Sequence, residues 1–389
     1  MDLTFTPEEK RFRAQVREWL HANVPREPRP LDTHAACAYD VAWQRKQYDG
    51  GWAGVSWPVE YGGRGLSLIE QLIWHEEYAR ADAPTVGNLF VGLNHGGPTL
   101  MVRGTEAQKS FHLPRILTGE AIWCQGFSEP GAGSDLAGIQ TRGVIDGHHL
   151  VVNGSKIWTS YAHHAHFQEL LVRTDSTGES RHSGLTWVIC DMKLPGVSVR
   201  PIRNMAGDLD FCQVFYDDVR IPLSNVVGEV GEGWSVAMST LGFERGTSVI
   251  AYQIEMSRAI EHLIELARRA ELPDGTGPAI EDAEIAARLA QLRAEISGMR
   301  AMTYAEISRG LSRPVPGPEG AMVSLYHGEL QKRLRSVAID ILGDDALAWV
   351  HGGLAWTYLT AFRHTIAGGT AEIRRNIIGE RVLHLPKGR

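Results

Sequence analysis

The spacing of apolar residues divides the chain into a helical stretch, a strand-rich stretch and a second helical stretch. Near the start, Phe12, Val16 and Leu20 recur on one helix face. Residues 6–9 (Thr-Pro-Glu-Glu) supply a cap, a proline at the first helical position and two acids, which is typical of a helix start. A second helical pattern covers residues 68–79. The chain is therefore predicted to be helical from residue 6 to about 120.

From about residue 121 to 225 the apolar residues form short β-rich runs instead. Residues 144–145 and 150–152 are predicted strands, and Asp146-Gly147 and Asn153-Gly154 are predicted tight turns. Further short runs lie at residues 185–190, 197–202 and 212–216.

Helical spacing returns after Gly233. Ile285, Leu289, Leu292, Ile296 and Met299 step by four and three residues, which indicates one buried face of a bundle helix. Polar, Gly/Pro-rich breaks at 271–278 and 312–320 separate the predicted helices. The predicted class is α+β, with a helical domain at 1–120, a central β-barrel or β-sandwich domain at 121–228 and a C-terminal four-helix bundle at 229–389.

Composition narrows the classes of function. A net charge of -7 argues against a nucleic-acid surface, which needs a basic field. The start of the chain lacks a signal-peptide pattern, and the sequence holds no apolar run of membrane-spanning length. The four cysteines form no C-x-x-C pair and suggest a reducing compartment, so we expect a cytoplasmic protein. His163, His164 and His166 lack a nearby ligand in helical register, so no metal site is expected.

The segment 128–133 (Ser-Glu-Pro-Gly-Ala-Gly), followed by Ser134 and Asp135, carries the strongest chemical signal. Its proline and two glycines impose a tight irregular loop, and glycine lets the backbone approach a flat or anionic ligand. The alternative is an ordinary surface turn. Residues 156–160 (Lys-Ile-Trp-Thr-Ser) favour the ligand loop, because Trp158 can lie on a planar ring and two hydroxyl side chains follow it.

These two motifs resemble the acyl-CoA dehydrogenase family of flavoproteins. The likeness continues in residues 57–65 (Trp-Pro to Gly-Gly-Arg-Gly), 104–109 (Gly-Thr-Glu-Ala-Gln-Lys) and 231–234 (Gly-Glu-Gly-Trp), so it spans nearly the whole chain. It implies an FAD cofactor and the domain order helical, β, helical. It also implies removal of the pro-R α-proton of an acyl thioester and transfer of a β-hydride to flavin N5, which gives the trans-2-enoyl thioester.

The resemblance suggests which residue is the catalytic base, because the family carries this base at one of two positions. Most members carry it near the C-terminus, just before a Gly-Thr pair, where this chain has Gly368. Branched- and long-chain members carry it on the first helix of the C-terminal bundle, before an arginine, where this chain has Glu244 and Arg245. We therefore expect Glu244 to be the base. The alternative is a helix-surface acid paired with a neighbour.

Further site residues follow from the resemblance. Trp158 is expected on the flavin, with a core aromatic as the alternative. Arg245 is expected to hold its helix or contact the pantetheine arm, with a surface salt bridge as the alternative. The backbone N–H of Gly368 is expected in the oxyanion hole. The expected cofactor contacts are Gln125, Phe127, Ser128, Gly133, Ser134, Trp158, Thr159, Ser160, Thr370 and Glu372, and the expected substrate contacts are Ser134, Arg245, Gly368 and Gly369.

One departure from the family concerns the adenine end of FAD. Many members grip the pyrophosphate of a neighbouring subunit with an Arg-x-x-Phe-Gly segment, which residues 270–277 lack. Asp340 and Asp344 stand near the place of an expected Gln and Gly-Gly, and their charges would repel a pyrophosphate. Other groups or a different partner subunit would then hold this end. Homo-dimers, homo-tetramers and hetero-tetramers with a related subunit all stay open.

The implied function is α,β-dehydrogenation of an acyl-CoA in lipid metabolism of the fatty-acid β-oxidation type, with electron-transferring flavoprotein as acceptor. Gly368 and Gly369 leave space that favours a branched, cyclic or otherwise bulky acyl group. One alternative is a substrate bound to an acyl-carrier protein in a biosynthetic pathway. Another is a subunit that completes a partner's flavin site. A flavin monooxygenase of the same fold is disfavoured because it would need no carboxylate base such as Glu244.

Overall fold

The computed structural model describes residues 5–177, 180–244, 248–272, 275–310 and 317–387, with only the backbone at 244, 248 and 249. The chain forms two compact units. The first unit contains residues 1–20, 68–82 and 245–389, and the second contains 21–67 and 83–244. The predicted α+β class is confirmed, with helical parts before and after a sheet in chain order. The three-domain boundaries at 120 and 228 stay a prediction.

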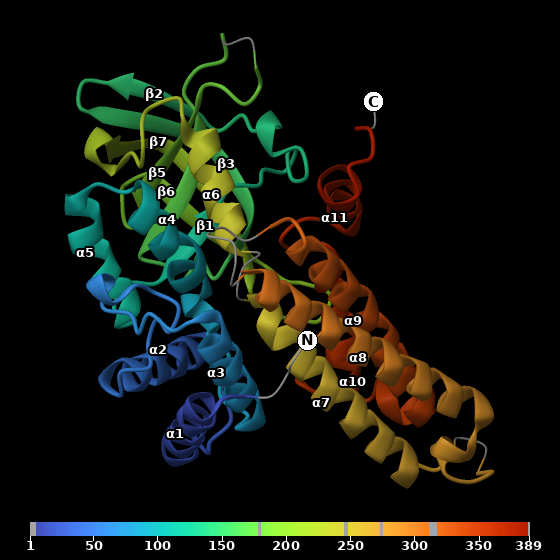
Figure 1. Ribbon diagram of the computed structural model, residues 1–389. Helices are drawn as coiled ribbons and strands as arrows, with labels where there is room; N and C mark the ends of the chain where they lie inside the picture. The colour runs from blue at the N-terminus through green and yellow to red at the C-terminus, as the bar shows by residue number, and fades with distance from the viewer. Residues whose placement is uncertain (1–4, 178–179, 245–247, 273–274, 311–316, 388–389) are drawn as a thin grey trace. The chain divides into compact units, whose positions relative to one another are not determined.

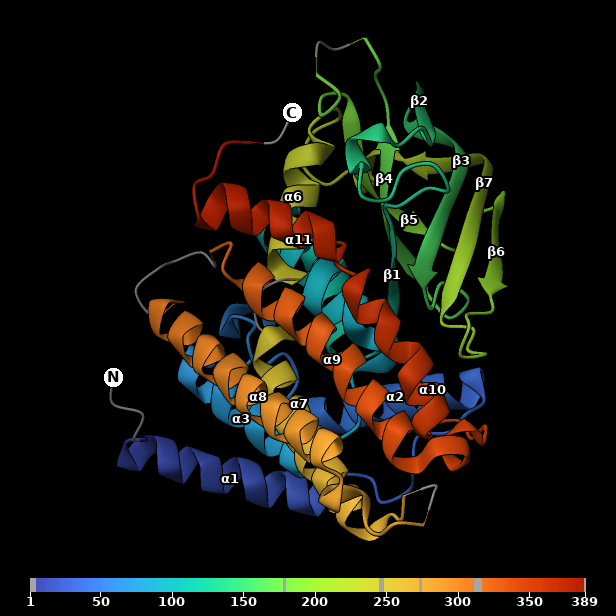
Figure 2. The same ribbon diagram turned by 90° about the vertical axis from the view of Figure 1, so that its right-hand side faces the viewer.

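The first unit is helical. Figures 1 and 2 show its long helices α7, α8 and α9 side by side. The predicted bundle face of α8 is confirmed, because Ile285, Leu289, Leu292, Ile296 and Met299 are all buried in the core of this unit. The helices are α1 (Pro7–Asn23, whose residues 21–23 fall in the second unit), α3 (Leu68–Arg80), α7 (Ser248–Arg269), α8 (Ala283–Gly310), α9 (Gly320–Leu342), α10 (Leu354–Ala361) and α11 (Ala371–Ile377).

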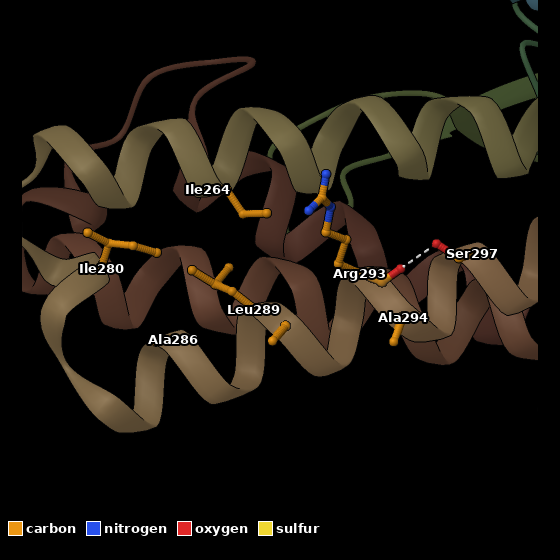
Figure 3. A pocket seen from close by; sticks show the side chains of 8 residues that line it. Ile264, Ile280, Ala286, Leu289, Arg293, Ala294 and Ser297 are labelled. Carbon is orange, nitrogen blue, oxygen red and sulfur yellow. Dashed lines mark hydrogen bonds between the residues drawn. The ribbon is translucent and has the colours of Figure 1, made fainter.

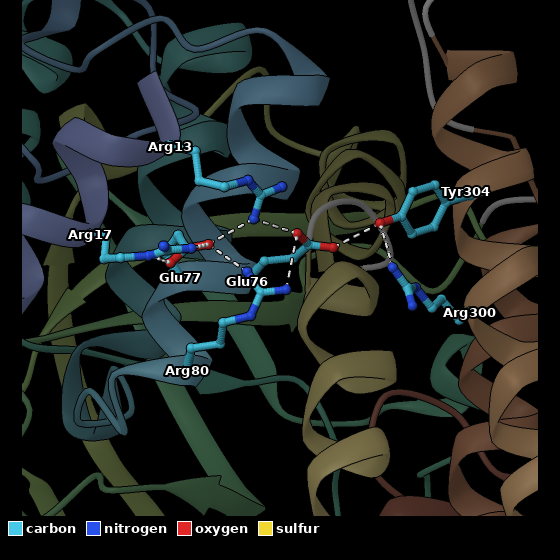
Figure 4. Close-up of polar contacts among 7 residues, drawn as sticks. All are labelled: Arg13, Arg17, Glu76, Glu77, Arg80, Arg300 and Tyr304. Carbon is cyan, nitrogen blue, oxygen red and sulfur yellow. Dashed lines mark hydrogen bonds and ion pairs between the residues drawn. The ribbon is translucent and has the colours of Figure 1, made fainter. Parts of the chain in front are cut away.

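A polar network joins α1, α3 and α8 within the first unit (Figure 4). Two adjacent carboxylates of α3, Glu76 and Glu77, are buried, and Arg13 of α1 donates to both at 2.8 and 2.7 Å. Arg17 adds a 2.8 Å contact to Glu77, and Tyr304 of α8 donates to Glu76 at 2.7 Å. These contacts fix the two short N-terminal segments of this unit to its long helices.

The second unit contains one curled seven-stranded sheet, with β1 and β4 parallel and most other neighbours antiparallel (Figure 2). Along the sheet the order is β1-β4-β2-β3-β7-β6. β1 and β2 pair with different parts of β4, and β5 pairs with β4 along its whole length. The strands are β1 (Trp123–Gly126), β2 (Arg142–Asp146), β3 (His149–Ser160), β4 (Phe167–Arg173), β5 (Leu185–Asp191), β6 (Val197–Ile202) and β7 (Phe211–Pro222). The helices of this unit are α2 (Thr33–Asp49), α4 (Gly97–Arg103), α5 (Glu106–Leu117) and α6 (Gly233–Glu244).

The predicted turn at Asn153-Gly154 is wrong, because β3 runs straight through it. Gly154 has a φ of +142°, and the pairing of β3 with β7 shifts register between Val152 and Gly154. A Cβ on Gly154 would lie 2.8 Å from the Cα of Thr141. The extra residue at this shift belongs to β7, where residues 217 and 218 lie opposite Asn153 alone. Gly154 therefore permits a register shift and a close backbone approach within one long strand.

Several sequence motifs have packing roles in the second unit. The Trp57 indole is buried and donates to the carbonyl of Leu93 at 3.0 Å. Thr105 and Gln108 form a capping box at the start of α5. Gly233 begins α6 where a Cβ would lie 2.5 Å from the Trp187 backbone. Among the helices that the structure describes, none combines the length and apolar character that crossing a membrane requires.

Candidate active site

The glycine-rich loop at residues 128–134 follows β1 in the second unit. Its base is closed by two reciprocal backbone hydrogen bonds between Glu129 and Ala132, at 2.9 and 3.0 Å. Its tip is open: Gly131 and Gly133 are exposed, and a Cβ on either would meet nothing within 4 Å. Ser134 is also exposed. The loop can therefore present backbone and hydroxyl groups to a ligand.

Lys156 of β3 anchors this loop, a role that the sequence did not reveal. Its side chain is fully buried, and Nζ donates to the Phe127 carbonyl at 3.0 Å and to the Glu129 carboxylate at 2.8 Å. Burial lowers the pKa of Lys156 to about 8, although the charge of Glu129 partly offsets this. The next amide, Ile157 N–H, donates to the Ser128 carbonyl at 2.9 Å. Two residues of β3 thus hold three consecutive residues at the start of the loop.

Trp158 is presented by a bulge in β3. The register with β7 shifts between Lys156 and Thr159, so β3 contains one extra residue there. Trp158 has a φ of +60°, which is rare for an aromatic residue and is characteristic of functional sites. Its side chain is 58% exposed and meets Phe211 edge-to-face at 6.1 Å between ring centroids. The expectation that Trp158 is available to a ligand agrees with this exposure, and the core alternative does not.

The other predicted contacts of this unit differ in what their side chains can reach. Thr159 and Phe127 are buried in the protein, so their side chains are not open to a ligand. Ser160 and Ser128 are half-buried. Gln125 of β1 is half-buried too, and its amide donates to the buried carboxylate of Glu169 at 2.7 Å. Glu169 therefore fixes the Gln125 amide.

The features of this unit fit a flavin. A planar ring needs an exposed flat face, which Trp158 offers, and a close backbone approach, which the open glycines Gly131 and Gly133 allow. A cavity of about 280 Å³ lies beside the loop, with Thr141 and Ser155 in its lining. The lining also contains Gly131 of the loop and the acid Glu129.

The second group of predicted residues belongs to the first unit. Gly368 and Gly369 have φ angles of +69° and +108°, which suit glycine alone. Thr370 then caps α11 by accepting from the Ile373 N–H at 3.3 Å, and Glu372 is exposed in the first turn. Arg374, buried on α11, donates to the Ala367 carbonyl at 2.6 Å. The sequence alone did not indicate Arg374, because nothing local distinguishes it from the exposed Arg375.

The predicted base lies at the end of α6, whose last residue is Glu244. Its backbone is helical, and its side chain lies outside the described part of the structure. Arg245 lies outside the described residues altogether. The catalytic assignment of Glu244 and the role of Arg245 therefore stay predictions.

Of the two acids expected to repel a pyrophosphate, Asp340 has its charge partly offset by an ion pair. Asp340 of α9 accepts from Arg288 of α8 at 2.7 Å, and both side chains are partly exposed. Asp344 follows in a short 3₁₀ turn. Residues 273–274 of the segment that lacks the Arg-x-x-Phe-Gly motif lie outside the described part.

A second hollow in the first unit has a different character (Figure 3). It is a groove of about 530 Å³ over α7 and α8, lined by apolar residues such as Ile264, Ile280 and Leu289. Its charged member, Arg293, pairs with Glu261 at 2.6 Å. The residues predicted for the active site are absent from its lining, so the groove is not part of the candidate site.

Comparisons with known proteins cover the whole chain. Models of the acyl-CoA dehydrogenase N-terminal, middle and C-terminal domains match residues 6–120, 124–219 and 231–383. The acyl-CoA dehydrogenase IpdE1 of Mycobacterium tuberculosis (strain ATCC 25618 / H37Rv) is 40% identical over 386 residues, or 97% of each chain. Two solved structures, the ChsE4-ChsE5 complex from Mycobacterium tuberculosis and the Tcur3481-Tcur3483 steroid ACAD, are each similar at 30% identity over 100% of both chains, with TM-scores of 0.83 and 0.85.

Proposed function

The chain belongs to the acyl-CoA dehydrogenase family, and we propose that it dehydrogenates the thioester of a branched, cyclic or otherwise bulky acyl group with Glu244 as the base. As a member of this family it is an FAD-dependent oxidoreductase that acts on acyl-CoA. The finer assignments, namely the acyl group, the base and the partners, are the substance of the proposal.

The observation that carries the proposal is the joint pattern at residues 244 and 368. The reaction needs one carboxylate at the α-carbon. Gly368 has no side chain, and its backbone angle of φ +69° disfavours any other residue. Glu244 ends α6, directly before the arginine that follows the base in branched- and long-chain members.

Each residue then has a defined task. Glu244 would take the α-proton, and the Gly368 N–H would donate to the thioester oxygen as negative charge develops there. Trp158 and the loop at 128–134 would hold the flavin, and Ser134 would contact the thioester arm. Bound FAD would accept the hydride from the β-carbon.

Space and similarity both support a bulky acyl group. Gly368 is exposed, and a Cβ on Gly369 would meet only Ile373, at 3.7 Å. A protein at 30% identity over the full chain is described as a steroid ACAD. A ring-containing acyl thioester is therefore the substrate class that we favour over a straight chain.

A second chain as partner is part of the same proposal. Two similar structures are each complexes of two differently named proteins. The absent Arg-x-x-Phe-Gly segment leaves the adenine end of FAD to other groups. We expect a related subunit to supply them, and FAD stoichiometry measured with this chain alone and with such a subunit checks it. The acyl-carrier substrate and electron-transferring flavoprotein as acceptor stay predictions.

Replacement of Glu244 tests the base directly. Glu244→Gln should bind FAD and thioester normally but reduce the flavin more slowly by about 10³-fold or more, the scale of a lost base. The measurement is the rate of anaerobic flavin bleaching by an active thioester. Glu232→Gln, an exposed acid just before α6, is the matched control and should react normally. Bleaching at a near-normal rate in Glu244→Gln would remove Glu244 from this role.

A further inference from the structure

The turn that contains Gly368 is held from below by one buried arginine. Arg374 lies on α11 and is 8% exposed. Its guanidinium donates to three carbonyls of the first unit: Ala367 at 2.6 Å, His364 at 2.8 Å and Ser324 at 3.4 Å. Two of these carbonyls belong to the segment that leads into Gly368.

The contact with Ala367 matters because of peptide geometry. The carbonyl of Ala367 and the N–H of Gly368 belong to the same planar peptide unit and point in opposite directions. A donor that fixes the carbonyl therefore fixes the N–H as well. Arg374 approaches the carbonyl, so the Gly368 N–H is directed away from it.

The Gly368 N–H is available to a ligand. Within the described residues, no backbone hydrogen bond uses this N–H, and Gly368 is exposed. By contrast, the N–H of the preceding residue, Ala367, donates to the Arg363 carbonyl at 2.9 Å. The turn thus satisfies one amide internally and leaves the next one open.

The positive charge of Arg374 affects the Ala367–Gly368 peptide in addition to fixing its orientation. A charged donor on a peptide carbonyl forms a stronger bond than a neutral one and polarises the N–H at the other end of the unit. The nearby His364 does not supply this charge, because burial and the charge of Arg363 lower its pKa to about 4. Arg374 is a charged donor in direct contact with the carbonyl of this peptide, at 2.6 Å.

We propose that Arg374 is a positioning residue that orients and polarises the Ala367–Gly368 peptide so that its N–H stabilises the thioester oxygen of the substrate. The inference rests on the proposed role of the Gly368 N–H. It adds a residue that touches neither substrate nor flavin and acts through the peptide.

The test uses Arg374→Met and Arg374→Lys holoenzymes, with Arg375→Gln as the matched control. Arg375 is the next residue, is exposed and contacts Glu329 at 3.5 Å. Removal of a whole oxyanion donor lowers kcat by about 10²–10³-fold, so a misdirected donor should lower flavin reduction by about tenfold or more. Arg374→Lys should recover part of the loss, and Arg375→Gln should match the wild type.

A spectroscopic readout separates positioning from stability. Pivaloyl-CoA has no α-hydrogen and cannot be dehydrogenated, so its ¹³C-labelled carbonyl reports hydrogen bonding in the intact complex. Its carbonyl stretch should fall on binding to the wild type, and the fall should shrink in Arg374→Met. If Arg374→Met does not fold, Arg374→Lys carries the comparison.

Two results would overturn the inference. One is an Arg374 variant with a lower melting temperature but the wild-type carbonyl shift and reduction rate, since Arg374 would then only stabilise the turn. The other is a carbonyl that does not shift even in the wild type. Failure of the proposed function looks different, because no thioester would then bleach the flavin of the wild type.

Discussion

At Trp158, one extra residue in β3 decides which surroundings the side chain meets. Lys156 and Trp158 are two positions apart, so a regular strand would place both on the same face. The bulge between them leaves Lys156 fully buried and Trp158 largely exposed. The φ of +60° at Trp158 is retained although it is unfavourable for an aromatic residue.

Substitution of Trp158 should weaken FAD binding and leave the stability of the fold nearly unchanged. Trp158→Ala should raise the Kd for FAD by about 2- to 12-fold, since an aromatic pair contributes about 0.5–1.5 kcal/mol beyond area burial. The visible spectrum of the bound flavin should shift, and the melting temperature of the apoprotein should change little. Titration of the apoprotein with FAD checks this, and Trp349→Ala, another exposed tryptophan, is the control. Unchanged affinity and spectrum would leave Trp158 without a flavin contact.

The candidate site positions gave stronger signals in the sequence than the residues that support them did. The loop at 128–134 and Trp158 were recognisable because their residue types are unusual. Lys156 and Arg374 were not, because lysine and arginine are normally exposed, and their burial depends on partners far along the chain. Thr159 shows the converse: its motif suggested a ligand contact, but its side chain is buried in the sheet.

At the scale of elements, β3 and the glycine-rich loop act as one piece. Glu129 accepts from Lys156 and also from the N–H groups of Gln140 and Thr141, at 2.7 and 2.8 Å. Burial alone would raise the pKa of Glu129, but Lys156 and these donors hold it below its usual range. The carboxylate thus links the loop, β3 and the segment before β2.

Lys156→Met should make the loop at 128–134 more mobile, because it removes the side chain that anchors the start of this loop. Loss of one partner of a buried ion pair typically lowers stability by about 3–5 kcal/mol. Hydrogen exchange should rise at the amides of Ala132, Thr141 and Ile157 in the apoprotein. Leu150→Ala, at a buried site on the same strand, is the control and should lower stability by about 2–5 kcal/mol without this local effect. Equal exchange in the two variants would mean that Lys156 does not anchor the loop.

Element boundaries show where local sequence signals failed. The face of α8 was predicted because it repeats over several turns. The turn predicted at Asn153-Gly154 was wrong because an Asn-Gly pair is also compatible with a strand opposite a bulge. The features that decide between the two, the pairing with β7 and the contact with Thr141, are not local in sequence. The buried strand β4 gave no alternating pattern, since Gln168 to Val172 are all buried, and it was not predicted.

The network on α3 predicts a pH dependence of stability. Burial would raise the pKa of Glu77, but hydrogen bonds from Arg17 and Arg13 and the charge of Arg80 lower it from 4.5 to about 2. A carboxyl whose pKa is lower in the folded state stabilises the protein above its unfolded pKa. This stabilisation should therefore be present at neutral pH and be lost as the pH falls from about 4.5 toward 2.

Glu77→Gln gives the measurement for this network. The difference in unfolding free energy between wild type and Glu77→Gln should be constant above about pH 5 and shrink below it. Glu8→Gln, which removes an exposed ion pair with Arg11 on α1, should change the pH profile little. A constant difference down to pH 3 would show that Glu77 keeps an ordinary pKa in the folded protein.

At the scale of the whole molecule, the order of motifs along the chain identified the family before any contact was known. The glycine-rich loop, the Trp158 segment and the C-terminal glycines can each be interpreted in several ways alone. Their order and spacing along the chain together fit few protein families. The acyl group is different, because it depends on space formed by side chains of many elements. The roles proposed for Glu244 and Gly368 concern the reacting end of the thioester, so they leave the identity of the ring or branch to experiment.

The central claim is that this FAD enzyme dehydrogenates a bulky acyl thioester. The most direct test is the anaerobic rate of flavin bleaching by ring-containing acyl-CoAs, including a steroid side-chain thioester, against butyryl-CoA and octanoyl-CoA. A ring-containing thioester should bleach the flavin faster, by about tenfold or more, the scale on which pocket fit discriminates between substrates. Faster bleaching by the straight chains would contradict it.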